Sequence, residues 1–204
     1  IKEMLGGLHS AKIILYSVDF AEIEECQAKG EWEKSGDILS DAALKLQAAG
    51  ADYIIICTNT MHKIAPQIQE KIAVPIIHIA DATADALVSA GVKKVALLGT
   101  KYTMTQNFYK ERLINRGLCV IIPDEKDIEL VNRVIYDELC LGVVSASSLV
   151  EYQRIIEGFK SAGAQGVILG CTEIGLLISQ ESSSLPVFDT TIIHAEKAAI
   201  MAAE

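Results

Sequence analysis

Two short polar runs hold the residues of this 204-residue chain that are best suited to chemistry. They read Thr58-Asn59-Thr60-Met61-His62 and Cys171-Thr172-Glu173. Their thiol, hydroxyl, imidazole and carboxyl groups can transfer protons or form directed hydrogen bonds. Each run directly follows an apolar stretch of strand length. Because ligands of open α/β sheets bind beyond the carboxyl ends of the strands, we expect both runs to lie at a ligand site.

The two runs occupy matching places in an internal repeat. Residues 50–60 resemble residues 163–173, and an ungapped alignment places Thr58 opposite Cys171. Each copy follows an amphipathic helical pattern and precedes a short helix and a strand led by proline. The repeat predicts two similar α/β halves that bring both loops to one cleft.

The elements that must position these loops alternate along the chain. Strands are expected at residues 11–18, 53–57, 74–78, 94–98, 119–122, 167–169 and 186–188. Helices are expected at residues 35–49, 61–71, 80–90, 105–115, 126–141, 147–162 and 194–204. Nearly continuous apolar strands that alternate with helices indicate parallel sheets covered on both faces.

We therefore expect an α/β fold of two pseudo-symmetric three-layer lobes with mainly parallel sheets and the active site in the cleft between them. The first lobe is expected to contain residues 1–91 and 187–204, and the second residues 92–186.

Composition restricts the class of protein. The formal net charge is −9 and there is no basic stripe, which argues against a nucleic-acid partner. No apolar run reaches the roughly 18 residues that span a bilayer, and the first residues lack the pattern of a signal peptide. The cysteines form no CxxC pair and no metal-ligand cluster, so we expect a reducing cytoplasm and no metal. They are Cys26, Cys57, Cys119, Cys140 and Cys171.

The two loops resemble those of the aspartate/glutamate racemase family. Its hallmarks are C-N-T-x-H, which here reads Thr58-Asn59-Thr60-Met61-His62, and G-C-T-E, which here reads Gly170-Cys171-Thr172-Glu173. Similarity also covers residues 97–103 and 188–194, and it extends over nearly the whole chain. It is greatest to the L-aspartate/glutamate-specific branch typified by the Escherichia coli enzyme. Family members also carry a strand and a glycine-rich turn before the segment that matches Ile1.

The resemblance implies a cofactor-independent racemase that interconverts the enantiomers of aspartate or glutamate. In the family, two acid/base groups act on opposite faces of the α-carbon, without pyridoxal phosphate as an electron sink. A cysteine suits this role because its ordinary pKa of about 8.5 allows both thiol and thiolate near neutrality. The resemblance further implies that Cys171 is catalytic, that the partner is a small acidic amino acid and that the protein is a homodimer.

The chain departs from the family pattern at the first acid/base position, which holds Thr58. Cys57 stands one residue earlier, and a shift of one residue near a strand end turns the side chain to the opposite face. We therefore predict an asymmetric site in which Cys171 is the base and Thr58 the proton donor. The family resemblance implies that the second cysteine serves the L-enantiomer, so we expect this site to favour the L-enantiomer as substrate.

Further polar residues are predicted to bind the substrate. They are Gln27, Asn59, Thr60, Thr100, Thr103, Thr172 and Glu173. Glu173 can orient the substrate amine or tune the thiol, and Gln27 is a candidate for the distal carboxylate. Some family members hold a lysine just before the glycine of the segment matching residues 136–142, where this chain has Leu141. The choice between aspartate and glutamate stays open.

Other interpretations remain at this point. The chain can be a related enzyme of the hydantoin racemase, maleate isomerase or arylmalonate decarboxylase type. It can also be an amino-acid-binding protein that kept the fold, which the loss of a thiol at Thr58 would fit. For single residues, Cys171 can be a small packing residue and Thr58 a helix N-cap.

Overall fold

The apolar runs around residues 94–98 and 167–169 form the two central strands of a parallel sheet in the computed structural model, which describes residues 1–203. The four strands lie in the order β4-β3-β5-β6. Their bounds are β3 (Lys94–Gly99), β4 (Cys119–Ile121), β5 (Val167–Gly170) and β6 (Val187–Asp189). The pairs are all parallel. This confirms the expected α/β class with parallel strands.

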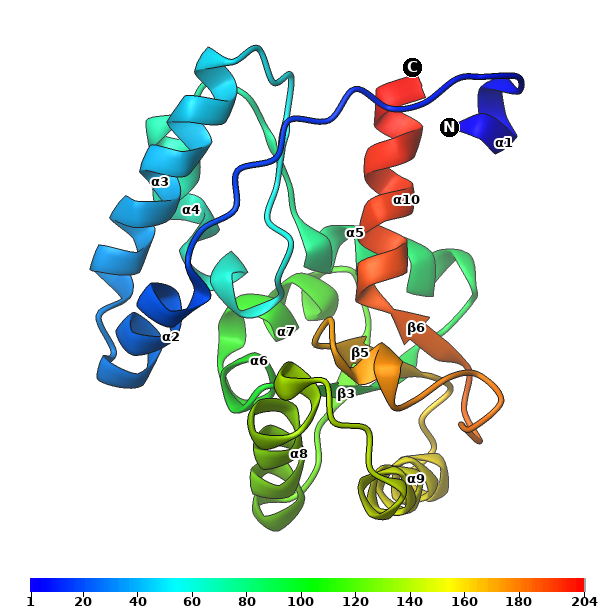
Figure 1. The fold of residues 1–204 in the computed structure, drawn as a ribbon. Helices are drawn as coiled ribbons and strands as arrows, with labels where there is room; N and C mark the ends of the chain where they lie inside the picture. Colours follow the sequence, from blue (N-terminus) through cyan, green and yellow to red (C-terminus); the bar gives the residue numbers. More distant parts are fainter. Residues whose placement is uncertain (204) are drawn as a thin grey trace. The chain divides into compact units, whose positions relative to one another are not determined.

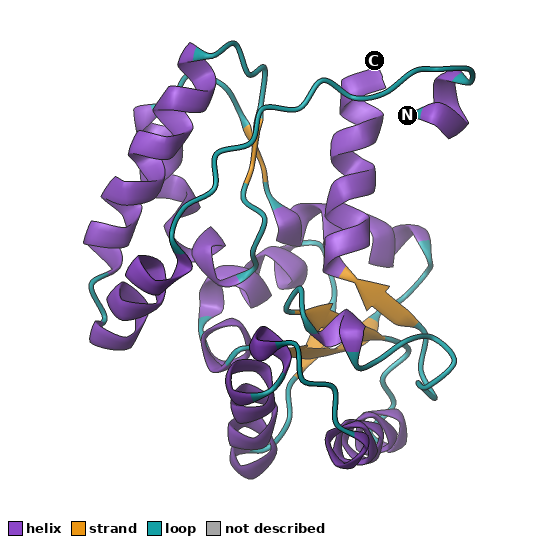
Figure 2. Cartoon of the chain, viewed as in Figure 1, coloured by secondary structure: helices purple, strands orange, loops and turns teal. Residues whose placement is uncertain are grey.

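Helices cover both faces of this sheet, as Figures 1 and 2 show. They are α5 (Ile79–Ser89), α6 (Lys101–Thr105), α7 (Asn107–Asn115), α8 (Glu125–Asp137) and α9 (Ala146–Ser161). Successive residues of the central strands enter two separate cores. Ala96 and Leu98 pack with residues of α8 and α9, whereas Val95 and Leu97 pack with residues of α5 and α7. Because both faces are buried, the strands need apolar residues at every position.

The described chain divides into two compact units, and this sheet with its helices belongs to the second. The second unit contains residues 57–60 and 79–195, and the first contains residues 1–56, 61–78 and the segment from Glu196 onward. The expected lobes had placed α5 and β6 with the first half of the chain. They pack in the second unit because β6 pairs with β5 and α5 supplies part of the core.

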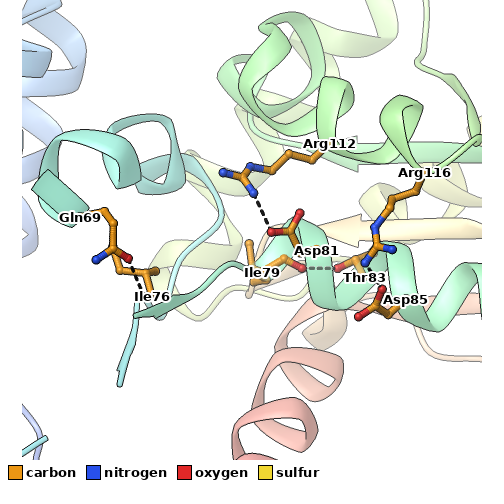
Figure 3. A network of polar contacts seen from close by, with 8 residues as sticks. All are labelled: Gln69, Ile76, Ile79, Asp81, Thr83, Asp85, Arg112 and Arg116. Atoms are coloured by element: carbon orange, nitrogen blue, oxygen red, sulfur yellow. Dashed lines mark hydrogen bonds and ion pairs between the residues drawn. The ribbon is translucent and has the colours of Figure 1, made fainter. Parts of the chain in front are cut away.

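Two ion pairs join α5 to α7 on the surface of the second unit (Figure 3). Arg112 Nη1 lies 2.6 Å from Asp81 Oδ2, and Arg116 pairs with Asp85 in the same way one turn further along both helices. All four side chains are well exposed, so each pair contributes only about 0–1 kcal/mol. The buried apolar residues therefore fix the position of α5, and the ion pairs add little.

The first unit is largely helical. Its elements are α1 (Lys2–Leu5), α2 (Phe20–Lys29), α3 (Trp32–Ala48), α4 (Ala65–Lys71), and the strands β1 (Ile54–Ile55) and β2 (Ile76–Ile77), which pair in parallel. The 3-10 helix η1 (Thr60–Ile64) joins the two units along the chain, and so does α10 (Thr190–Ala203). A separate apolar core, which includes Ile23, Ile54 and Ile68, packs α2, α4 and β1 together.

Several expected elements are shorter in the structure, such as the helix 126–141, which ends as α8 at Asp137 and is followed by the 3-10 helix η2 (Leu139–Leu141), and two differ more. Residues 11–18 form no strand, and Ile13 and Leu15 are each 80% exposed. The prediction was wrong because an apolar run becomes a strand only where a neighbour satisfies its backbone, and no described strand pairs with these residues. The expected helix 61–71 is divided into η1 and α4, with Pro66 in the first turn of α4, where its missing N–H is tolerated. Within residues 1–203, none of the helices combines the length and apolar character that crossing a bilayer demands.

Candidate functional site

The site is built where β3 and β5 end side by side. Gly99 and Gly170 are the last residues of these strands and are register partners. A Cβ atom at Gly170 would lie 2.8 Å from the Leu98 carbonyl oxygen, and one at Gly99 would lie 2.7 Å from the Gly170 carbonyl oxygen. Only glycine permits this approach. The residues that follow, Thr100 and Cys171, therefore begin at the same edge of the sheet.

The loop of residues 57–60 is fastened to this edge by two hydrogen bonds. Thr60 Oγ1 lies 3.0 Å from Thr100 Oγ1, just beyond β3. Asn59 Nδ2 donates over 3.0 Å to Thr190 Oγ1, just beyond β6, and Thr190 Oγ1 in turn donates over 2.7 Å to the Leu169 carbonyl oxygen. Since β3 and β6 flank β5, the loop crosses the carboxyl end of β5, where Cys171 follows.

Three buried hydroxyl groups form a chain on the β3 side of the site. Thr100 is the N-cap of α6, and its Oγ1 accepts from the Thr103 backbone N–H over 3.3 Å. The Thr100 and Thr103 hydroxyls lie 3.2 Å apart, and the Thr60 hydroxyl extends the chain. The structure thus joins three of the predicted binding residues in one hydrogen-bonded group.

The Cys171 thiol is 8% exposed and is held by the carboxylate two residues later. Its Sγ donates to Glu173 Oε2 over 3.0 Å, and Thr172 Oγ1 donates to the same oxygen over 2.7 Å. Burial raises the pKa of Cys171 well above its ordinary value, and the negative charge of Glu173 raises it further. Without a ligand, the group is therefore a thiol that donates to a carboxylate.

The other thiol and hydroxyl groups near these loops differ from Cys171. Cys57 is exposed, although neighbouring atoms desolvate its thiol and raise its pKa. Thr58 is partly buried. β1 begins at Ile54 and β5 at Val167, and these two residues are opposite each other in the ungapped repeat. Thr58 therefore keeps the position that corresponds to Cys171, as the sequence alignment places it.

One buried acceptor is unused. Asn59 is 2% exposed, and within residues 1–203 its Oδ1 has no hydrogen-bond partner. The neighbouring hydrogen bonds fix the orientation of the Asn59 side-chain amide. The Thr190 hydroxyl donates its proton to the Leu169 carbonyl, so it can only accept from the Asn59 amide nitrogen. A buried unpaired acceptor costs about 1–3 kcal/mol. A ligand N–H group would satisfy it.

The remaining predicted residue, Gln27, belongs to the first unit. It is buried in α2, and its Nε2 donates to Met61 Sδ over 3.0 Å. His62 and His78 are also buried in that unit, with ring centroids 4.4 Å apart. Within the described residues, no group of three His, Cys, Asp or Glu side chains could hold a metal ion.

Thr190 has a place in the site that the sequence did not reveal as a binding position. It follows the last residue of β6. This position at a strand end was the one feature of the sequence that could have indicated a binding residue. Thr190 can bond Asn59 beside Cys171 because β6 is the neighbour of β5, and that strand pairing is set by tertiary structure.

Comparison with known proteins shows the family of the chain. The family described as Asp/Glu/Hydantoin racemase matches residues 1–198 of the chain. The chain belongs to this family. Its fold is the two-lobed α/β fold of the solved relatives, with parallel sheets.

Two solved structures are similar over the whole chain. One is a Yersinia pestis protein described as a candidate Asp/Glu racemase, with 54% identity, a TM-score of 0.92 and coverage of 100% of this chain and 89% of that chain. The other is an aspartate racemase homologue from Pyrococcus horikoshii, with 38% identity, a TM-score of 0.85 and coverage of 100% and 88%.

A curated relative is the broad specificity amino-acid racemase RacX of Bacillus subtilis. It is 28% identical over 151 residues, which are 74% of this chain and 65% of the relative. The match thus spans slightly less than two thirds of that relative's length.

Proposed function

We propose that this protein is a racemase that moves a proton from one face of the α-carbon of aspartate or glutamate to the other, without a cofactor, and favours the L-enantiomer. The observation that carries the proposal is the Cys171 thiol, buried and hydrogen-bonded to Glu173, at the strand end that the loop of residues 57–60 crosses. An acid/base group at a strand end, surrounded by hydrogen-bonding side chains, suits proton abstraction next to a carboxylate.

The substrate's charged groups have complementary partners in this proposal. The α-ammonium donates to the unused Oδ1 of Asn59. The Thr60 hydroxyl donates to the α-carboxylate, and the Thr103 and Thr100 hydroxyls support it through their chain of hydrogen bonds. When the α-proton leaves, negative charge spreads onto that carboxylate, and fixed donors stabilise it there.

Cys171 must lose its proton to solvent before it can act as the base. The charge of Glu173 raises the pKa of this thiol. A substrate ammonium close to Glu173 would offset that charge and lower the pKa, so the thiolate forms more readily in the complex. Its Sγ then takes the α-proton of the L-enantiomer, and the Thr58 hydroxyl delivers a proton to the opposite face. Solvent afterwards reprotonates Thr58 and accepts the Cys171 proton.

The test is α-deuterium exchange in deuterated water, with L-aspartate and L-glutamate in separate incubations. NMR follows incorporation at the α-carbon, and chiral chromatography follows the D-enantiomer. We expect both signals from the wild type and a loss of about 10³-fold in Cys171→Ser, because a positioned acid/base group contributes roughly 10²–10⁴.

Cys119→Ser is the matched control, since it removes an exposed thiol from β4. It should keep wild-type rates. Binding of either amino acid without any exchange would refute the racemase and identify a binding protein. Exchange that survives in Cys171→Ser would refute the role given to this thiol.

A further inference from the structure

The short helix that follows Glu173 is hydrogen-bonded to the loop that carries the Cys171 thiol. This 3-10 helix is η3 (Ile174–Leu176). The Ile174 N–H donates to the Cys171 carbonyl oxygen over 3.2 Å, and the Leu176 N–H donates to the Glu173 carbonyl oxygen over 3.0 Å. The Ile174 side chain is fully buried in the same apolar core as Cys171. Because such cores are closely packed, a shift of η3 also moves the backbone that carries the thiol and the Glu173 carboxylate.

The middle residue of η3 lies against the carboxylate of Asp189. A Cβ atom at Gly175 would lie 2.7 Å from Asp189 Oδ2 and 3.8 Å from Asp189 Cγ. Ordinary van der Waals contact begins at 3.4 Å, so a side chain at this position needs about 0.7 Å more room. The backbone of Gly175 is not in the left-handed region, so alanine is compatible with its conformation. The close approach of Asp189 is what restricts this position to glycine.

The Asp189 carboxylate is itself held in place at the carboxyl end of β6. Its Oδ1 accepts from the Thr191 N–H over 2.8 Å and from the Ile192 N–H over 3.4 Å, as the N-cap of a helix does. β6 pairs with β5 and leads directly into α10 (Figure 1). Rotation of the carboxylate away from Gly175 would cost these capping bonds. Asp189 therefore links the start of α10 to η3 within the second unit.

We propose that Gly175 and Asp189 are positioning residues for the Cys171 thiol. Their close packing holds η3 in place, and η3 holds the Glu173 carboxylate at hydrogen-bond distance from Cys171 Sγ. The inference rests on the proposed racemase function and adds two residues that act through Glu173. A residue larger than glycine at position 175 would displace η3 and lengthen the bond of 3.0 Å from the thiol to Glu173.

The first test observes the thiol directly and does not depend on turnover. It measures the rate at which iodoacetamide alkylates Cys171 as a function of pH, by mass spectrometry of the peptide that contains this residue. Glu173 raises the pKa of Cys171, so Gly175→Ala should weaken this effect and move the alkylation midpoint to lower pH. Alkylation at neutral pH should become several-fold faster. Cys140 of η2 and Tyr152 of α9 also interact electrostatically with Cys171, and Gly175→Ala replaces neither.

Two further variants separate positioning from a general loss of structure. Gly158→Ala is the matched control, because a Cβ atom at this glycine of α9 would meet no atom within 4 Å. It should keep the wild-type midpoint. Asp189→Ser can still cap α10 but lacks the carboxylate, so Asp189→Ser combined with Gly175→Ala leaves room for the new methyl group and should restore the wild-type midpoint.

An unmoved midpoint in Gly175→Ala overturns the inference, and so does a double variant that stays as far from the wild type as Gly175→Ala. If Gly175→Ala does not fold, Asp189→Ser alone takes its place, because η3 then loses its neighbour. A wild-type midpoint in Asp189→Ser would in that case overturn the inference.

A comparison in the Glu173→Gln background tests whether the two residues act through Glu173. The charge is absent there, so Gly175→Ala should move the alkylation midpoint no further. A further shift as large as the one that Gly175→Ala causes in the wild type overturns the inference, because it would show that η3 affects the thiol by another route.

Kinetics connect this packing to catalysis. Gly175→Ala should lower the plateau value of kcat for the L-substrate about 10-fold, because a misplacement of about 1 Å can cost roughly 10²-fold and the displacement expected here is smaller. The rising limb of the kcat/KM profile should move to lower pH together with the alkylation midpoint. A limb that does not follow the midpoint, in an enzyme that exchanges the α-proton, overturns the inference. If the midpoint moves as expected while no amino acid exchanges its α-proton, the positioning role stands and the racemase proposal fails.

Discussion

The two copies of the internal repeat build the same scaffold with the same backbone contacts. The Ile54 N–H donates to the Pro75 carbonyl over 2.9 Å, and the Val167 N–H donates to the Pro186 carbonyl over 2.9 Å. A glutamine fastens the proline-led strand in each copy. Gln69 Oε1 accepts from the Ile76 N–H, as Figure 3 shows, and Gln180 Oε1 accepts from the Val187 N–H, both over 2.9 Å.

The copies differ in the residues that their first strands present to the site. One copy ends in Cys171 with Glu173 two residues later, and the matching positions of the other hold Thr58 and Thr60. In one copy, the Glu173 carboxylate raises the pKa of the Cys171 thiol. Thr60 occupies the matching position in the other copy, and its hydroxyl is hydrogen-bonded to Thr100. The comparison teaches that a duplicated scaffold can present a thiol in one copy and a hydroxyl in the other while these backbone contacts stay equivalent.

After Cys171, the largest effect is expected from substitution of Thr58. Thr58→Ala should lower formation of the D-enantiomer about 100-fold, because a positioned proton donor contributes roughly 10²–10⁴. α-Deuterium exchange of the L-substrate should continue, since Cys171 is intact. Thr58→Cys should make the copies alike and increase turnover of the D-enantiomer. Chiral chromatography started from each enantiomer measures both changes.

Cys57→Ala is the control for this comparison and should have little effect. The reverse pattern, with full activity in Thr58→Ala and none in Cys57→Ala, would show that Cys57 is the second group and that the repeat alignment does not describe the chemistry.

A smaller effect is expected from Glu173→Gln. Because burial and Glu173 raise the pKa of Cys171, the thiolate fraction increases with pH up to that raised pKa, and kcat/KM for the L-substrate should rise with it. The neutral amide removes the charge of Glu173 and lowers the pKa of Cys171. The rising limb of the pH profile should therefore move to lower pH.

Glu157→Gln is the control, because it changes the net charge by the same amount at an exposed position of α9. It should leave the rising limb of the pH profile at the wild-type pH. An unmoved profile in Glu173→Gln would mean that Glu173 acts only on the substrate and does not tune the thiol.

The smallest effect compares the two glutamines. Gln180→Met removes two hydrogen bonds to the backbone around a proline-led strand. Gln69→Met removes the two equivalent bonds and a longer third one, to the Ile72 carbonyl. Each should lower the free energy of unfolding by about 1–2 kcal/mol, since a hydrogen bond contributes roughly 0.5–1.5 kcal/mol net. Urea unfolding followed by circular dichroism measures both.

Gln106→Met provides the baseline, because within residues 1–203 its side chain makes no hydrogen bond. If either glutamine variant lowers the free energy of unfolding no more than this control does, the two copies are not stabilised by equivalent glutamine hydrogen bonds.

Much of the scaffold could be predicted from the sequence because the signals are local. The apolar runs that became β3 and β5 are buried on both faces, and such strands need apolar side chains throughout. The alignment of Thr58 with Cys171 is matched by the starts of β1 and β5. Local composition and strand-end position therefore determined the fold class and the two loops that carry the candidate chemistry.

The contacts that assemble the site could not be predicted in this way because they are not local. The bonds from Asn59 to Thr190 and from Thr60 to Thr100 depend on which strands neighbour β5. Residues 11–18 have a strand-like pattern but no described partner, so the pattern alone did not make a strand. Hydrogen bonds between distant segments decide strand pairing and unit boundaries, and only the tertiary structure establishes them.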